Sequence, residues 1–260
     1  MLKITVKDAE GQEILSKGGE RELSLFCRRT YEEGDRIVLE CSEKDCFLWL
    51  QIDDALGRSL IYFKDTMEYI IPFGEKRINK SPKAFFGEKH LIWVKCARDF
   101  EVKAYRNLAL NVNDQSGITT CYPHATANVE TRGESVFAAV NAIDGVTANE
   151  SHGMWPFESW GINRQDDATI RIDFGREVEI DRIILYTRAD FPHDNWWEQA
   201  TICYSDGSKE QLAMEKSALP HEFLIPKKKV TWIALCDLIK ADDPSPFPAL
   251  TQIEVYGNDL

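Results

Sequence analysis

One segment, residues 188 to 198, concentrates side chains that can bind a polar ligand. It reads Arg-Ala-Asp-Phe-Pro-His-Asp-Asn-Trp-Trp-Glu, so a guanidinium, an imidazole, three carboxylates and two indoles lie on one connection. An indole offers a flat apolar face to the C–H face of a sugar ring, whereas Arg, His, Asp and Asn make directional hydrogen bonds to hydroxyls. These residue types predict a sugar pocket that contains Arg188, His193, Asp194, Trp196 and Trp197.

Tryptophan is unevenly distributed along the chain, and four of the seven lie between residues 155 and 197. Adjacent residues on an extended chain face opposite ways, so we expect one of Trp196 and Trp197 to point inward and close the end of the fold. A second polar stretch supplies further candidates for the pocket. They are Trp155, Trp160, His152 and Arg164.

Alternate residues from 124 to 132 are polar, and on an extended chain these side chains project to one side. They are His124, Thr126, Asn128, Glu130 and Arg132. Two interpretations stay open: a solvated strand face whose Glu130–Arg132 pair adds little stability, or a wall of the same pocket. The three arginines Arg132, Arg164 and Arg188 would favour an acidic or uronic sugar over a neutral one.

The elements that position these residues are predicted to be strands. Period-2 alternation dominates and stretches with a 3.6-residue period are scarce, so the expected class is all-β, with two β-sandwich domains. The first part predicts strands at Leu2–Lys7, Glu22–Cys27, Arg36–Cys41, Phe47–Ile52, Leu60–Phe63, Tyr69–Pro72, His90–Cys96 and Glu101–Tyr105. The second part predicts strands at Thr169–Phe174, Asp181–Thr187, Gln199–Tyr204, Glu222–Ile225, Thr231–Leu238 and Thr251–Tyr256. One short helix is expected at Glu134 to Ala142.

Polar turn-forming residues cluster at Asn111 to Gly117, between two apolar patterns. We therefore expect a β-sandwich domain of unassigned family in residues 1 to 115 and a second domain in residues 116 to 260. Asp35 to Glu40 and Asp181 to Tyr186 share a pattern, which is compatible with two sandwiches of related design.

The composition limits the classes of binding partner that we expect. The 260 residues carry 31 Lys+Arg against 43 Asp+Glu, which gives a net charge of -12 and a pI near 5.0. Such a chain repels a phosphate backbone or an anionic leaflet at long range. No apolar run approaches the roughly 18 residues of a membrane-spanning helix. We expect neither nucleic acid nor a membrane as a partner.

The seven cysteines are odd in number, and most have β-branched or aromatic neighbours, as buried thiols do. Only Cys41 and Cys46 lie close in sequence, and no second pair completes a tetrahedral zinc site. The first residues, Met-Leu-Lys-Ile-Thr-Val, follow a strand pattern without the features of a signal peptide. A cytoplasmic protein is the expectation.

An ordered series of motifs runs from residue 120 to residue 258. It comprises Asn141-Ala-Ile-Asp-Gly145, Trp155, Ser159-Trp-Gly161, Ala168 to Gly175, Val178 to Tyr186, Ser205-Asp-Gly207 and Thr251 to Gly257. This series resembles the galactose-binding-like jelly roll, the fold of discoidin, coagulation factor 5/8 type C (F5/8 type C) domains and family 32 carbohydrate-binding modules. The chain also resembles uncharacterised bacterial two-domain carbohydrate-binding proteins. The resemblance implies a jelly roll in this part and a glycan as its ligand.

The resemblance also implies a structural calcium ion. In such modules a short helix leads into an Ala-x-Asp-Gly turn, and calcium joins that turn to the last strand. Carried over, the ligands are Asp144, Thr147, Asn149 and Glu254, all oxygen donors as a hard cation requires. The chain departs from the pattern at residues 149 to 153, where relatives often carry Thr-x-Trp. The alternative is a turn that Asp144 only caps.

These features predict a non-catalytic carbohydrate-binding protein. One alternative is a structural or protein-interaction β-sandwich. A second alternative is a glycan-active hydrolase or lyase, in which Glu130, His193 and Asp194 would supply an acid and a base. The sequence contains no known catalytic motif that includes these residues. An enzyme would need a deeper cleft, such as one between the domains, with a shifted carboxylate or histidine pKa.

Overall fold

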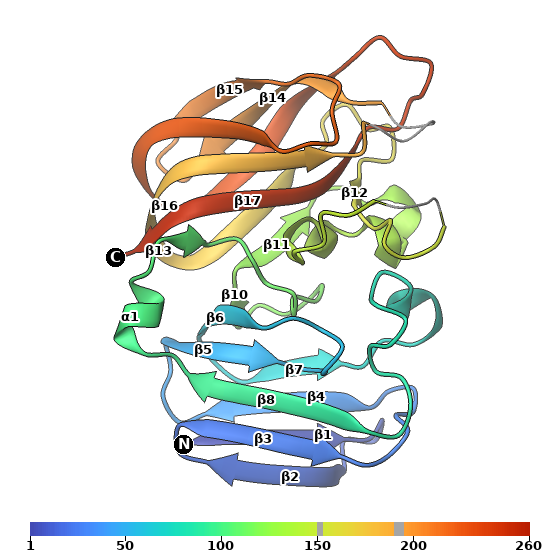
Figure 1. Cartoon of the computed structure of the whole chain (residues 1–260), viewed down its shortest axis with the longest axis vertical. Helices are drawn as coiled ribbons and strands as arrows, with labels where there is room; N and C mark the ends of the chain where they lie inside the picture. Colours follow the sequence, from blue (N-terminus) through green and yellow to red (C-terminus); the bar gives the residue numbers. More distant parts are fainter. Residues whose placement is uncertain (150–152, 190–194) are drawn as a thin grey trace.

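The computed structural model describes residues 1–149, 153–189 and 195–260. Antiparallel strands make up nearly all of its regular structure, so the predicted all-β class is confirmed (Figure 1). The strands form two halves, with β1 to β8 in the lower half of Figure 1 and β11 to β17 in the upper half. Within the described ranges, no helix is long and apolar enough to cross a membrane.

The first half is a sandwich of two antiparallel sheets around one apolar core. One sheet has the strand order β2-β1-β4-β7 and the other has the order β10-β6-β5-β8-β3. Alternation builds the core, as in β3, where Leu23, Leu25 and Cys27 are buried and the residues between them are exposed. The strands are β1 (Leu2–Lys7), β2 (Glu13–Gly19), β3 (Glu22–Cys27), β4 (Arg36–Cys41), β5 (Cys46–Gln51), β6 (Ser59–Phe63), β7 (Met67–Ile70), β8 (His90–Cys96) and β10 (Cys121–Tyr122).

The second half is one bent sheet that closes around a core of its own. β13 (Ile170–Thr187) pairs on one edge with β16 (His221–Lys240), and on the other edge with β11 (His124–Ala127) and then β17 (Ala249–Asp259). The β13–β16 register shifts near Gly175, which has φ +70° and would clash with Tyr122 if it carried a Cβ. The remaining strands are β12 (Trp160–Gly161), β14 (Trp197–Tyr204) and β15 (Lys209–Ala213).

The predicted boundary near residue 115 lies in a segment that serves both cores. Before it, β9 (Arg106–Asn107) pairs with β17, and Leu108 belongs to the second core. After it, β10 pairs with β6, and Ile118 belongs to the first core. The chain therefore enters the second half, returns to the first, and leaves again, so the division at 115 stays a prediction.

Two predicted elements are wrong. The strand expected at Glu101–Tyr105 is instead a short helix, α1 (Asp99–Val102), because the Glu101 carboxylate accepts a hydrogen bond from the Arg98 N–H at 2.7 Å and closes a helical turn. The helix expected at Glu134 to Ala142 is two 3-10 turns, η3 (Ser135–Phe137) and η4 (Ala139–Ile143), because Ala138 between them is extended. The other 3-10 turns are η1 (Gly74–Arg77) and η2 (Thr131–Gly133).

Candidate functional site

Three arginines that the sequence singled out line one pocket of about 200 Å³ in the second half. Arg132 comes from η2, Arg164 from the loop after β12, and Arg188 from the end of β13. The aromatic rings of Phe137 and Phe247 complete the wall. We call this the arginine pocket, and its other lining residues are Thr131, Gly161, Ile162, Asn163, Pro248 and Ala249.

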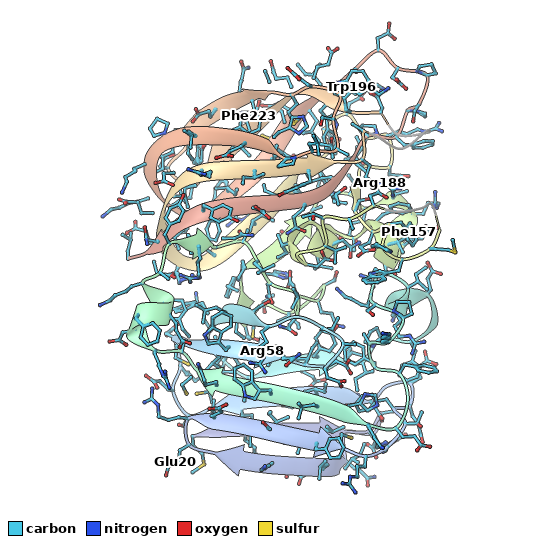
Figure 2. The ribbon with its side chains drawn as sticks, in the orientation of Figure 1. Glu20, Arg58, Phe157, Arg188, Trp196 and Phe223 are labelled. Atoms are coloured by element: carbon cyan, nitrogen blue, oxygen red, sulfur yellow. The ribbon has the colours of Figure 1, made fainter. Side chains whose placement is uncertain are left out.

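Each arginine is held differently. Arg132 is exposed and forms two hydrogen bonds of 2.6 Å with the carboxylate of Glu134. Arg188 is 1% exposed and donates from Nη1 to the Phe157 carbonyl at 2.7 Å, and Figure 2 shows these two residues close together at one end of the second half. Arg164 is exposed, and its guanidinium lies 4.5 Å from the centre of the Phe247 ring.

Arg164 is the arginine best placed to meet a ligand. Among the described residues, no carboxylate lies within ion-pair distance of its guanidinium, while the Phe247 ring fixes its plane. Phe247 is 42% exposed and stands in the sequence Pro244-Ser-Pro-Phe-Pro248. Sequence reasoning missed Phe247 and Phe137, although an aromatic residue within a proline-rich loop was a usable signal.

The tryptophans take roles that alternation only partly predicted. Trp197 is the inward member of its pair, 1% exposed, and its ring centre lies 6.4 Å from that of Trp160, which is fully buried. Trp196 is half-buried and lies at the opposite end of the second half from the first half (Figure 2), with the Lys216 ammonium 4.8 Å from its ring. Trp160 and Trp197 therefore belong to the core and face no ligand.

Three further residues predicted for the pocket, His152, His193 and Asp194, lie outside the described residues.

The alternating polar set does not form one wall. His124 is buried, and its Nδ1 lies 2.8 Å from the Asp114 carboxylate, because the strand turns that side chain toward the first half. Glu130 accepts a hydrogen bond of 2.8 Å from the Ala139 N–H and lines a different cavity from the arginine pocket. Of this set, only Arg132 lines the arginine pocket, so of the two interpretations the pocket wall applies to Arg132 alone.

The predicted calcium ligands do not form one site. Asp144 is buried and caps the turn, since its Oδ1 accepts a hydrogen bond of 2.9 Å from the Val146 N–H. Thr147 and Asn149 line a separate opening whose described residues include no carboxylate. The side chain on β17 that meets the turn is Gln252, which accepts from the Gly145 N–H at 3.2 Å, and not Glu254. This donor set does not fit a divalent cation.

Calcium is accordingly expected to leave the stability of the chain unchanged. A bound ion would stabilise the folded state by mass action, and these residues supply no cage for it. Thermal unfolding in millimolar calcium and in excess EDTA should give melting temperatures that agree within about 1 °C. A clear rise with calcium that magnesium does not reproduce would contradict this prediction.

A second feature lies where the halves meet. A cavity of about 510 Å³, the inter-domain cavity, is lined by the first-half residues Tyr69, Lys76 and Lys80 and by second-half residues that include Glu130 and Glu134. A smaller pocket of about 140 Å³ reaches Lys80 from another direction and is lined by Asp144 and by Trp155, which is 37% exposed. Burial raises the pKa of Asp144 to about 7.

Comparisons with known proteins find partial matches among solved structures. No family model and no curated protein matches the chain. Chitosan-binding module 1 of a chitosanase/glucanase from Paenibacillus sp. IK-5 is 19% identical over 58% of this chain and 98% of that chain, with a TM-score of 0.42. A fucose-binding module of Streptococcus pneumoniae is 16% identical over 59% and 98%, with a TM-score of 0.43.

The family 32 carbohydrate-binding module of C. perfringens NanJ, solved with galactose, is 17% identical over 51% of this chain and 91% of that chain, with a TM-score of 0.39. These neighbours are carbohydrate-binding β-sandwiches, the group that the motifs of residues 120 to 258 resemble. The ligand of this chain has to be inferred from the residues of the arginine pocket.

Proposed function

We propose that the chain is a glycan-binding protein whose arginine pocket holds an acidic sugar. The observation that carries the proposal is the convergence of Arg132, Arg164 and Arg188 with two phenylalanine rings on one pocket. Guanidinium groups pair with carboxylates through two parallel hydrogen bonds, and aromatic rings pack on the apolar face of a sugar. The volume of about 200 Å³ is smaller than the roughly 300 Å³ of drug-sized pockets and suits one sugar ring.

Local charge favours an anion although the whole chain is acidic. The net charge of -12 repels anions at long range, but salt screens that field over roughly 10 Å, so the groups in contact with the ligand decide. The charged residues that line the arginine pocket are three arginines, and of these Arg132 already pairs with Glu134 and Arg188 donates to the Phe157 carbonyl. A uronic acid therefore gains an ion pair with Arg164 that a neutral hexose cannot make.

Replacing Arg164 with alanine is expected to weaken the binding of glucuronate or galacturonate roughly 10- to 100-fold, since a hydrogen bond to a charged group contributes about 1.5–3 kcal/mol. Isothermal titration calorimetry on the full chain measures this, with glucose and galactose as neutral comparisons. The matched control is Arg171→Ala, because Arg171 also lies over a ring, 4.3 Å from that of Trp232, but outside the pocket. Equal binding of neutral and acidic sugars would sink the proposal.

One observation favours a second candidate, a glycan-active hydrolase or lyase. Asp144, whose pKa burial raises to about 7, lines the pocket that adjoins the inter-domain cavity. The Asp144 carboxyl is the group of this pocket that could act as an acid or a base near neutral pH. Incubation with acidic oligosaccharides, followed by mass spectrometry of the products, tests this candidate, and intact oligosaccharides after prolonged incubation would reject it.

A further inference from the structure

The inter-domain cavity joins parts of the chain that are far apart in sequence. In Figure 1 the teal turn of the first half, which includes η1, lies against the yellow-green turns of the second half. Two hydrogen bonds connect them, from Ser135 Oγ to the Glu75 carbonyl at 2.5 Å and from Asn79 Nδ2 to Asn141 Oδ1 at 2.8 Å. The cavity therefore lies at a junction where hydrogen bonds hold the two halves together.

One segment forms a wall of both the inter-domain cavity and the arginine pocket. Within residues 130 to 138, Arg132 and Phe137 line the arginine pocket, whereas Glu134 and Ser135 line the inter-domain cavity. The Arg132–Glu134 ion pair spans this wall. One stretch of chain therefore separates the arginine pocket from the inter-domain cavity.

Lys80 is the unusual residue of this cavity. It is 8% exposed, and its backbone N–H donates to the Arg77 carbonyl at 2.9 Å. Its side-chain ammonium makes no hydrogen bond or ion pair with any residue that the structure describes. A lysine with so little exposure is normally paired, and Lys80 borders both the inter-domain cavity and the smaller pocket. Lys80 lies within electrostatic reach of three carboxyl groups, those of Asp114, Asp144 and Glu158. Burial raises the pKa of each, and the positive charge of Lys80 lowers it by a smaller amount.

The carboxylates that line the inter-domain cavity mostly have partners already. Asp114 pairs with His124, Glu134 pairs with Arg132, and Glu130 accepts from a backbone N–H. Lys76, one turn before Lys80, also has no ion-pair partner among the described residues. Glu75, the remaining carboxylate of the lining, has no ion pair among the described residues. Lys76 and Lys80 are the two ammonium groups of the cavity without a direct ion pair, and they are the groups that a carboxylate of a ligand would meet.

We propose that the inter-domain cavity is a second subsite for an acidic oligosaccharide, in which the Lys80 ammonium pairs with the carboxylate of a uronic acid unit beyond the one held in the arginine pocket. This inference rests on the proposed function. It assigns the first half a part in binding, because Lys76, Lys80 and Tyr69 all come from it. The ligand is then an oligouronide, and affinity depends on its length.

The test is calorimetry on the full chain with galacturonate oligomers of one to four units. The wild type is expected to bind longer oligomers at least tenfold more tightly than the monomer. Lys80→Met should abolish that gain and leave monomer affinity unchanged, while Lys80→Arg should keep most of it. Lys83→Met is the matched control, since Lys83 is exposed on the same loop and lines neither cavity.

A second variant keeps the test decisive if Lys80→Met fails to fold. Ser116 lies exposed at the rim of the inter-domain cavity, so Ser116→Trp fills the cavity without touching Lys80. It should also remove the gain with length. If the monomer binds but length adds nothing, or both variants keep the gain, the second subsite is wrong while the proposed function stands. If no uronide of any length binds, the proposed function itself fails.

Discussion

Replacing Trp160 or Trp197 with alanine is expected to lower the free energy of unfolding by roughly 3–5 kcal/mol in each case. Both indoles are at most 1% exposed, and their ring centres lie 6.4 Å apart in the core of the second half. Truncation removes the transfer free energy of a large apolar side chain and leaves a cavity that a bent sheet cannot close. Urea denaturation followed by circular dichroism measures the loss.

The neighbouring Trp196 supplies the control. It is half-buried, and its described ring contact is with the Lys216 ammonium at 4.8 Å, so Trp196→Ala should cost less than about 1 kcal/mol. Equal losses at 196 and 197 would contradict the assignment of one to the core and the other to the surface.

Substitution by phenylalanine distinguishes the two core tryptophans, because their indole N–H groups differ in hydrogen bonding. Trp160 donates from Nε1 to the Val129 carbonyl at 2.9 Å, whereas the buried Nε1 of Trp197 has no hydrogen-bond partner among the described residues. Trp160→Phe removes the hydrogen bond to the partly buried Val129 carbonyl, so it should destabilise the fold about 1 kcal/mol more than Trp197→Phe. The reverse order would show that the Trp197 N–H is satisfied.

Replacing Asp144 with asparagine is expected to make the chain more stable at pH 8 and to flatten the dependence of its stability on pH. Burial raises the pKa of Asp144 to about 7, so the folded state favours the protonated carboxyl. The resulting stabilisation is complete below the ordinary carboxyl pKa and disappears as the pH rises through about 7. The difference amounts to at most roughly 4 kcal/mol.

Asparagine keeps the carbonyl oxygen that accepts from the Val146 N–H, and it carries no charge at any pH. The wild type should therefore lose stability between pH 5 and pH 8 to a greater extent than Asp144→Asn, as measured by denaturation at both pH values. Asp206→Asn is the control, because hydrogen bonds from Ser208 lower the pKa of Asp206 and it does not titrate in this range. Parallel pH profiles for the wild type and Asp144→Asn would refute the expectation.

Sequence reasoning identified the arginines of the candidate site but not its full composition. Arg132, Arg164 and Arg188 were singled out as a group that favours an acidic sugar, and they line one pocket. Phe247 and Phe137 were missed, because an isolated phenylalanine in a loop carries no periodic signal and its neighbours are set by packing. Trp160 was predicted to contact the ligand and is instead a core residue. The neighbouring Ser and Gly residues do not distinguish a tryptophan that is buried in the core from one that lines a pocket.

The period-2 alternation predicted the all-β class and the approximate location of most strands, because alternation is a local property that burial of one face of a strand imposes. It also indicated that Trp196 and Trp197 would face opposite ways. The tertiary structure alone decided which of them points inward, that Gln252 rather than Glu254 meets the Asp144 turn, and that Lys80 lies beside Asp144. These are contacts between residues far apart in the chain, and their geometry depends on how the two halves pack, which no local pattern encodes.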